Sequence, residues 1–217
     1  MNEKLTGPIL KPKSGKIENI IIFLHGYGAN GNDLIEIGKS WFQYIPNTLF
    51  VSPNAPFNCQ WSQDAFQWFD LTSIAPEKIG QGIKTAGPFL NDFIDQNIET
   101  YKIDENKIFY VGFSQGAMMA LHHICKRKKK CAGILAYSGM LFENKDFDKE
   151  VISTFPIRLY HGIDDEVISS DFSTKANEKL KSLGFDINYH LQKNLGHGID
   201  NFGLDYGLKF IKKIFNI

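Results

Sequence analysis

The sequence is poor in cysteine, has no long apolar run and carries no net charge, and each absence excludes a class of protein. Three cysteines among 217 residues are a small and odd number, which argues against a disulfide framework. The longest continuous apolar stretch, Ile20 to Leu24, is far too short to cross a bilayer. We therefore expect no integral membrane association.

Positive and negative side chains are balanced. Lysine plus arginine and aspartate plus glutamate both number 24, so there is no long-range field that would attract nucleic acid. The basic run from Lys126 to Lys130 is interpreted as the solvated end of a helix, where cations favour the helix dipole. Residues 5–16 are rich in glycine, proline and lysine and lack the apolar core of a signal peptide. We expect a cytoplasmic protein with no nucleic-acid partner.

Apolar strands and segments of helical spacing alternate along almost the whole chain. The expected strands are 20–24, 48–52, 108–111, 133–137, 157–161 and about 187–191. The expected helices are about 33–45 with Asp33 as N-cap, 83–98, 117–126, 170–183 and about 202–215. Strands that alternate with helices are typical of a mostly parallel sheet with helices on both faces. We predict one α/β domain over residues 1–217, with residues 1–16 as an N-terminal extension or edge strand.

Residues 57–76 show no clear period, although they contain Trp61, Phe66, Trp68 and Phe69. A connection of this length is more often functional than idle. The sequence therefore predicts a long aromatic loop with a role in the site.

Ser114 is the candidate nucleophile, within Gly112-Phe113-Ser114-Gln115-Gly116. It lies between a predicted strand and a predicted helix. A sharp strand-to-helix turn exposes the serine, the flanking glycines permit the strained turn, and the helix N-terminus supplies N–H donors. The plain alternative is a chance match in a chain with 19 glycines. The strand before the motif and the helix after it argue against that alternative.

The candidate oxyanion loop is His25-Gly26-Tyr27-Gly28, directly after the first strong strand. In folds with such a serine turn, one N–H comes from this early loop and one from the residue after the serine. These groups belong to Tyr27 and Gln115. Without the serine motif, a simple glycine turn would explain the loop equally well.

The base and the acid are expected to follow Ser114 in the chain, the acid first. Of the six histidines, His161 and His197 compete for the role of base. His197 is favoured, because it follows the last predicted strand, at the edge where active sites of open α/β sheets gather. Asp164 and Asp165 are the candidate acids. Only one of two adjacent side chains can point inward, and spacing alone leaves both open.

Six stretches, taken together and in this order, resemble the phospholipase/carboxylesterase family of α/β-hydrolases, which includes acyl-protein thioesterases. They are Leu24 to Leu34, Ser52 to Pro56, Trp68 to Asp70, Gly112 to Gly116, His161-Gly162-x-x-Asp165, and Gly196-His197. The resemblance runs from about residue 20 to the C-terminus. It implies a single-domain α/β-hydrolase fold without a large cap domain.

The resemblance also implies roles for individual residues. The final aspartate of the family's His-Gly-x-x-Asp pattern is catalytic, which makes Asp165 the acid. Tyr27 and Gln115 would supply the oxyanion N–H groups. Trp68 and Phe69 would bind substrate as walls or supports of the acyl pocket. Eukaryotic thioesterases commonly have an aliphatic residue in place of Tyr27, so this difference favours a bacterial-type carboxylesterase.

The predicted function is hydrolysis of short to medium acyl esters through an acyl-enzyme on Ser114, with His197 as base and Asp165 as orienting acid. Lysophospholipids and acyl thioesters are further candidate substrates. The mechanism needs no cofactor and no metal, and neighbouring His122 and His123 point to different faces of a helix. Alternatives are an amide or lactone hydrolase with the same triad and a non-catalytic ligand-binding module. The expected partner is a small-molecule substrate, and the protein is expected to be a monomer or homodimer.

Overall fold

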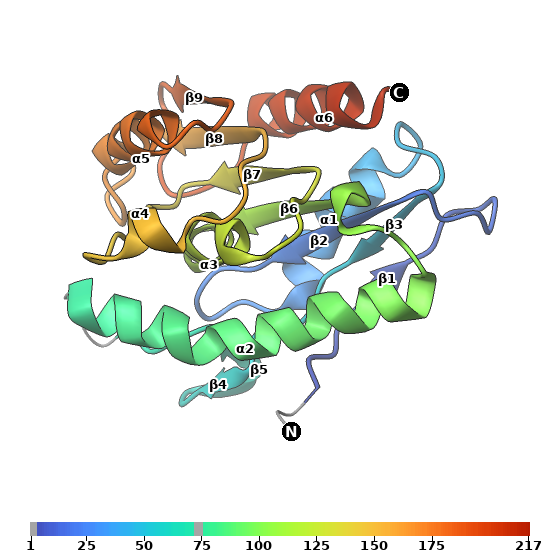
Figure 1. The fold of residues 1–217 in the computed structure, drawn as a ribbon, viewed down its shortest axis with the longest axis horizontal. Coiled ribbons are helices and arrows are strands. Elements are labelled where there is room, and N and C mark those ends of the chain that lie inside the picture. The colour runs from blue at the N-terminus through green and yellow to red at the C-terminus, as the bar shows by residue number, and fades with distance from the viewer. Residues whose placement is uncertain (1–3, 72–75) are drawn as a thin grey trace.

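The computed structural model describes residues 4–71 and 76–217. Over these residues, seven strands form one sheet in the order β1-β3-β2-β6-β7-β8-β9 (Figure 1). Their bounds are β1 Ile9–Leu10, β2 Asn19–Leu24, β3 Thr48–Val51, β6 Ile108–Phe113, β7 Gly133–Tyr137, β8 Ile157–Gly162 and β9 Ile187–Gln192. Strand β1 is antiparallel to β3 at one edge, and the other neighbouring pairs are parallel. The predicted mostly parallel α/β fold is confirmed. Residues 1–3 of the expected N-terminal extension lie outside the described residues.

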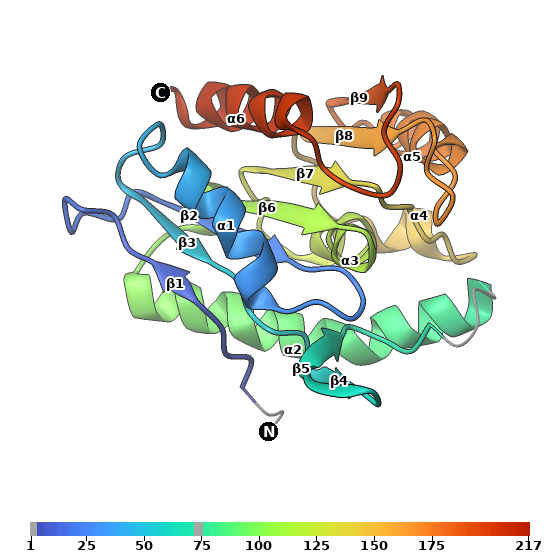
Figure 2. The same cartoon turned by 180° about the vertical axis from the view of Figure 1, so that it is seen from behind.

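Helices cover both faces of the sheet (Figures 1 and 2). One face is covered by α1 (Gly31–Trp41) and α6 (Asn201–Phe215), and the other by α2 (Pro76–Tyr101), α3 (Gln115–His123) and α5 (Asp171–Ser182). The short helix α4 (Phe147–Glu150) and the 3₁₀ turns η1 (Glu105–Lys107) and η2 (Ile124–Lys126) lie in connections, and the sequence analysis missed α4 and η1. The helix expected at 117–126 is α3 followed by η2.

Strand β2 shows why its sequence is apolar throughout. Ile20, Ile22 and Leu24 pack in the layer with α2, α3 and α5, whereas Ile21 and Phe23 pack in the layer with α1 and α6. All five are fully buried. Each such side chain stabilises the fold by about 1.5–3 kcal/mol relative to an exposed position. A strand buried on both faces therefore needs a continuous apolar run and not an alternating one.

Helix α1 begins earlier than predicted. Its N-cap is Asn30, whose side chain accepts from the Asn32 N–H at 2.8 Å. Asp33 is not the N-cap: it is the third helical residue, and its carboxylate accepts from the Asn30 N–H at 3.0 Å. This reciprocal capping box satisfies N–H groups that would otherwise lack partners at the helix start. The prediction of Asp33 as N-cap was wrong because both residues are good caps and only geometry separates them.

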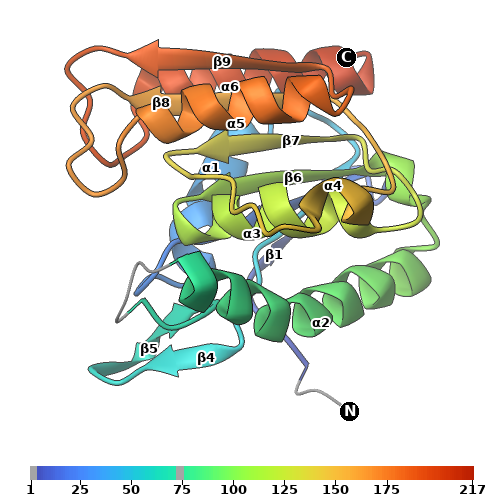
Figure 3. The ribbon, with the colours of Figure 1, turned by 60° about the vertical axis from the view of Figure 1, so that its left-hand side comes forward.

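The predicted aromatic loop contains a β-hairpin. Strands β4 (Phe57–Cys59) and β5 (Ser62–Gln67) pair antiparallel, and the hairpin projects beside α2 (Figure 3). Residues 72–75 of the expected loop lie outside the described residues. The hairpin escaped prediction because β5 begins with three exposed polar residues and the register shifts between Asn58 and Cys59, so no alternation is visible. Apart from this hairpin and α4, the described residues add nothing large enough to form a cap. None of the helices they form has the length and apolar character needed to span a membrane.

In the basic run at 126–130, Lys128, Lys129 and Lys130 are exposed, as predicted for a solvated helix end, whereas Arg127 is not. The side chain of Arg127 is only 12% exposed and forms a two-point contact with Glu105, itself 4% exposed. Arg127 also donates to Asn91 at 2.8 Å and to Asp95 at 2.5 Å. Arg127 therefore joins α2 and η1 to the segment that follows η2.

Candidate active site

Ser114 occupies a strained turn between β6 and α3. Its backbone has φ +53° and ψ −116°, a conformation that a residue with a side chain rarely adopts. The Ser114 N–H donates to the Tyr137 carbonyl at 2.9 Å, which fixes the turn to the neighbouring strand. A Cβ at Gly112 would lie 2.6 Å from the backbone of Ala117, and one at Gly116 would lie 1.9 Å from the Leu24 carbonyl. Both glycines of the motif are therefore required by close backbone approach.

Three residues from separate loops meet at the carboxyl edge of the sheet. The Nε2 atom of His197 lies 3.0 Å from Ser114 Oγ, and its Nδ1 atom lies 2.7 Å from Asp165 Oδ2. A carboxylate accepts, so His197 Nδ1 carries the hydrogen and Nε2 is free to accept from the serine hydroxyl. This arrangement matches the geometry of a Ser-His-Asp triad. Of the competing candidates, the structure brings His197 and Asp165 to the serine.

Asp165 is held as a carboxylate. Oδ1 accepts from the Val167 and Ile168 N–H groups, each at 2.9 Å, and Oδ2 lies 3.0 Å from His161 Nε2 as well as contacting His197. Burial alone would raise the pKa of Asp165, but the donors from Ile168, His197 and Val167 together lower it below its usual value. The group is therefore ionised at neutral pH. Asp164 instead is exposed.

The candidate oxyanion loop, residues 25–28, is anchored by a buried histidine. His25 Nε2 accepts from the Ala55 N–H at 2.9 Å, so Nδ1 carries the hydrogen and donates to the Gly26 carbonyl at 2.7 Å. Burial lowers the pKa of His25, which keeps the ring neutral. Among the described residues, neither the Tyr27 nor the Gln115 backbone N–H has a protein acceptor. Tyr27 and Gln115 stay the predicted donors to a substrate oxygen.

Trp68 and Phe69 are both buried, with exposed fractions of 0% and 2%, and Phe69 also lines a cavity of about 490 Å³. Their role as walls or supports of an acyl pocket stays a prediction. The Trp68 indole donates to the His25 carbonyl at 3.0 Å. The buried Gln115 side chain accepts from the Trp68 N–H at 2.8 Å and donates to the Phe69 carbonyl at 2.7 Å. The residue after the serine is thus held by its side chain, a contact that the sequence motif does not reveal.

The hairpin is the part of the site that sequence reasoning missed. Phe66 of β5 exchanges two backbone hydrogen bonds with the oxyanion loop, accepting from Gly28 and donating to Ala29, each at 2.9 Å. The Trp61 ring lies 5.3 Å from the Tyr27 ring, and it covers Gly28. The only sequence signal was the aromatic content of the segment, which does not identify a partner.

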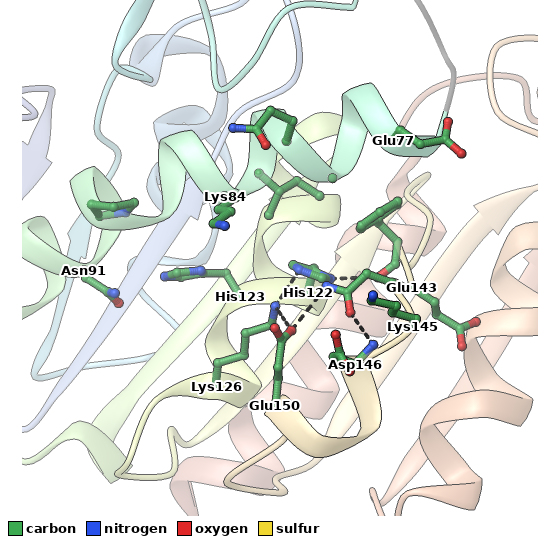
Figure 4. Close-up of a pocket in the computed structure, with 16 residues that line it drawn as sticks. Glu77, Lys84, Asn91, His122, His123, Lys126, Glu143, Lys145, Asp146 and Glu150 are labelled. Carbon is green, nitrogen blue, oxygen red and sulfur yellow. Dashed lines mark hydrogen bonds and ion pairs between the residues drawn. The ribbon is translucent and has the colours of Figure 1, made fainter.

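The histidines at the end of α3 belong to a different region. A cavity of about 800 Å³ lies between α2, the end of α3 and the segment 142–150, and no triad residue lines it (Figure 4). His122 Nδ1 donates to the Phe142 carbonyl at 2.7 Å, and Lys126 bridges His122 Nε2 and Glu150, each at 2.6 Å. Burial, reinforced by the Lys126 charge, lowers the pKa of both His122 and His123 to about 4. Within residues 4–71 and 76–217, no three His, Cys, Asp or Glu side chains are grouped to hold a metal ion.

Comparisons with known proteins identify the family and the fold. The sequence model of the Phospholipase/Carboxylesterase family matches residues 6–215. Acyl-protein thioesterase 1 of Neurospora crassa is 28% identical over 211 residues, which cover 88% of this chain and 84% of that protein. Esterase YpfH of Escherichia coli is 25% identical over 195 residues, which cover 90% of this chain and 82% of that protein. The crystal structure of esterase PE8 is 36% identical and superposes with a TM-score of 0.94, covering 98% of this chain and 100% of that one.

Proposed function

Because this chain belongs to the phospholipase/carboxylesterase family and is a hydrolase of the carboxylesterase or thioesterase type, we propose that Ser114, His197 and Asp165 are its catalytic triad. The observation that carries the proposal is the continuous contact from Ser114 Oγ to His197 Nε2 at 3.0 Å and from His197 Nδ1 to Asp165 Oδ2 at 2.7 Å. Both distances are within the range for proton transfer and for orientation of the base.

In the first half-reaction, Ser114 Oγ attacks the acyl carbonyl carbon while His197 Nε2 takes the hydroxyl proton. Asp165 stabilises the resulting imidazolium through the Nδ1 hydrogen bond. The carbonyl oxygen becomes an oxyanion, which accepts from the Tyr27 and Gln115 N–H groups. Collapse of this intermediate breaks the bond to the alcohol or thiol, which leaves with the proton from His197. An acyl ester on Ser114 remains.

The second half-reaction repeats these steps with water. His197 Nε2 takes a proton from a water molecule while the water oxygen attacks the acyl carbon, and the same two N–H groups bind the new oxyanion. Collapse returns the proton to Ser114 Oγ and releases a carboxylic acid. The chain thus ends in its starting protonation state.

The substrate proposed is a carboxylic ester with an apolar acyl group of short to medium length. The loop that carries Asp165 exposes Ile163 and Val167, with 44% and 71% of their surface accessible, and the hairpin exposes Trp61 at 61%. Apolar side chains on the loops of the site favour an apolar acyl chain over a charged one. Lysophospholipids and acyl thioesters share this acyl chemistry and are candidate substrates as well.

Hydrolysis of p-nitrophenyl esters from acetate to palmitate tests the proposal. We expect Ser114→Ala to lose most of the activity at every chain length, whereas Ser40→Ala, a serine on α1 remote from the site, retains it. The acyl chain length with the highest kcat/KM indicates how long an acyl chain the pocket accommodates. Wild-type turnover by Ser114→Ala would refute the triad. Ligand binding without hydrolysis of any ester, thioester or amide would favour a non-catalytic module.

A further inference from the structure

A second histidine contacts the carboxylate of the proposed triad. His161 lies in β8 and is fully buried. Its Nε2 atom is 3.0 Å from Asp165 Oδ2 and 2.9 Å from the Ile168 carbonyl, and its Nδ1 atom is 2.8 Å from Ser173 Oγ on α5. Every ring nitrogen of His161 therefore has a protein partner.

These partners determine the protonation state of His161. Asp165 and the Ile168 carbonyl can only accept, so Nε2 carries a hydrogen that they share, and Nδ1 accepts from the Ser173 hydroxyl. Burial lowers the pKa of His161, although the Ile168 carbonyl and the Asp165 charge oppose the shift. Asp165 and His197 are the titratable groups whose charges act on it. From the packed elements, α5 presents the neutral Ser173, and β9 pairs Leu191 with His161. The ring is therefore a neutral donor.

Asp165 Oδ2 consequently receives two imidazole N–H groups, one from His161 and one from His197. His161 approaches this oxygen from β8 and His197 approaches it from the loop after β9, while Oδ1 is occupied by backbone N–H groups. The end of β8 lies close against that loop at Gly162, where a Cβ would lie 2.1 Å from the Leu195 carbonyl. If the His161 donor were removed, Oδ2 would be held by His197 alone and the carboxylate could rotate.

We propose that His161 is a positioning residue for the reaction: its Nε2–H holds Asp165 Oδ2 in line with His197 Nδ1. This inference rests on the proposed function of the triad. It gives His161 a role that differs from that of a core histidine, because the side chain acts on the orientation and on the charge of Asp165. Two consequences separate these roles.

The first consequence is kinetic. A rotated carboxylate would misalign His197 in the transition state, and a misplacement of about 1 Å can cost up to about a hundredfold in rate. The loss would appear in kcat, with KM little changed, because His161 touches no substrate. A core histidine would instead affect the amount of folded enzyme and leave turnover per folded molecule unchanged.

The second consequence is structural. In the folded enzyme His161 must carry its hydrogen on Nε2, because this N–H is the group that holds Asp165 Oδ2. A histidine that served only as a core residue would have no such requirement.

The test compares two substitutions of His161 whose amide side chains differ in length. His161→Gln has a side chain long enough to place an N–H near the Nε2 position, whereas His161→Asn is shorter and reaches only the Ser173 side. His123→Asn, which alters a histidine with no triad contact, is the matched control. We measure kcat and KM for p-nitrophenyl acetate at neutral pH and correct for the amount of folded enzyme by near-UV circular dichroism.

We expect His161→Asn to lose kcat by at least about tenfold, on the scale of a displaced catalytic group, with KM little changed. His161→Gln should recover most of the rate, and His123→Asn should match wild type. Equal kcat values for the Gln and Asn variants would overturn the positioning role. This would leave the triad intact, because only activity retained by Ser114→Ala refutes the triad.

A measurement on the wild type decides the question if the variants do not fold. In a ¹⁵N-labelled sample, imidazole nitrogens that carry a hydrogen are distinguished from those that do not by their chemical shifts. We expect His161 to have a protonated Nε2 and an unprotonated Nδ1 at neutral pH. The opposite tautomer, with no hydrogen on Nε2, would remove the donor on which the proposal depends and overturn it.

Discussion

Removal of Arg127 should destabilise the protein strongly, because it leaves the carboxylate of Glu105 buried without its partner. The Glu105 side chain is 4% exposed and that of Arg127 is 12% exposed. The guanidinium contacts the carboxylate at two points, through Nε and through Nη2 at 3.1 Å from Oε2. Breaking a buried pair by removing one member typically costs about 3–5 kcal/mol. At about 2–4 °C per kcal/mol for a chain of this size, Arg127→Leu should lower Tm by about 6–20 °C.

The assay is thermal and urea unfolding followed by circular dichroism, with Lys129→Leu as the control from the same basic run. Lys129 is exposed, so its substitution should change the free energy of unfolding by no more than about 0.5 kcal/mol. The double variant Arg127→Leu/Glu105→Leu removes both charges and should be more stable than Arg127→Leu alone. The reasoning is refuted if Arg127→Leu costs no more than Lys129→Leu, or if the double variant is the less stable one.

Three further predictions concern the oxyanion loop, the serine turn and the cavity beside α3. Trp61→Ala should lower kcat, because it removes the ring that packs on Tyr27, but by less than the roughly hundredfold typical of a lost oxyanion donor, because the Tyr27 N–H remains. Its Tm should barely change. An unchanged kcat would show that the contact between the two rings does not matter for turnover. Gly116→Ala should lower the number of reactive serines per molecule in an active-site titration, because its Cβ would lie 1.9 Å from the Leu24 carbonyl oxygen and would displace the serine turn. A wild-type number of reactive serines would contradict this. His122 has its pKa lowered from 6.5 to about 4 by burial, so the unfolded chain binds the proton more readily, and stability is complete above pH 6.5 and lost as pH falls towards 4. Between pH 6.5 and 4, the lowered pKa of His122 should account for about 3 kcal/mol of the free energy of unfolding measured in urea. His122→Gln should therefore lose less stability than wild type as the pH falls. If the two proteins lose stability in parallel, His122 is not the cause.

The sequence predicted the parts of the site that depend on local geometry. A serine between a strand and a helix, flanked by glycines, can adopt few conformations, so its turn could be inferred from five residues. His197 could be favoured because the ends of parallel strands meet at one edge of the sheet. For the acid, local spacing left Asp164 and Asp165 open, and only the family resemblance pointed to Asp165.

What escaped prediction depends on contacts between segments far apart in the chain. The hairpin pairs with the oxyanion loop through Phe66, some 37 positions after Ala29 by their numbering, and its exposed polar residues carry no periodic signal. Arg127 lies within a run of lysines, and nothing local distinguishes the one cation whose partner, Glu105, is buried. Composition could not reveal either contact, because both are decided by which side chains the completed fold brings together.

Close backbone contacts explain why the three proposed catalytic residues meet at all. The triad joins loops after β6, β8 and β9, and side-chain packing alone would tolerate shifts between such loops. Gly116 brings the serine turn against the end of β2, and Gly162 brings the end of β8 against the His197 loop, in both cases at distances no Cβ could occupy. A contact between two backbone segments cannot relax by a change of side-chain rotamer, so it fixes the position of one segment relative to the other. Substitutions in the apolar core should therefore reduce mainly stability, whereas substitutions at these two glycines should reduce turnover per folded molecule, because catalytic geometry is sensitive to shifts of about 1 Å.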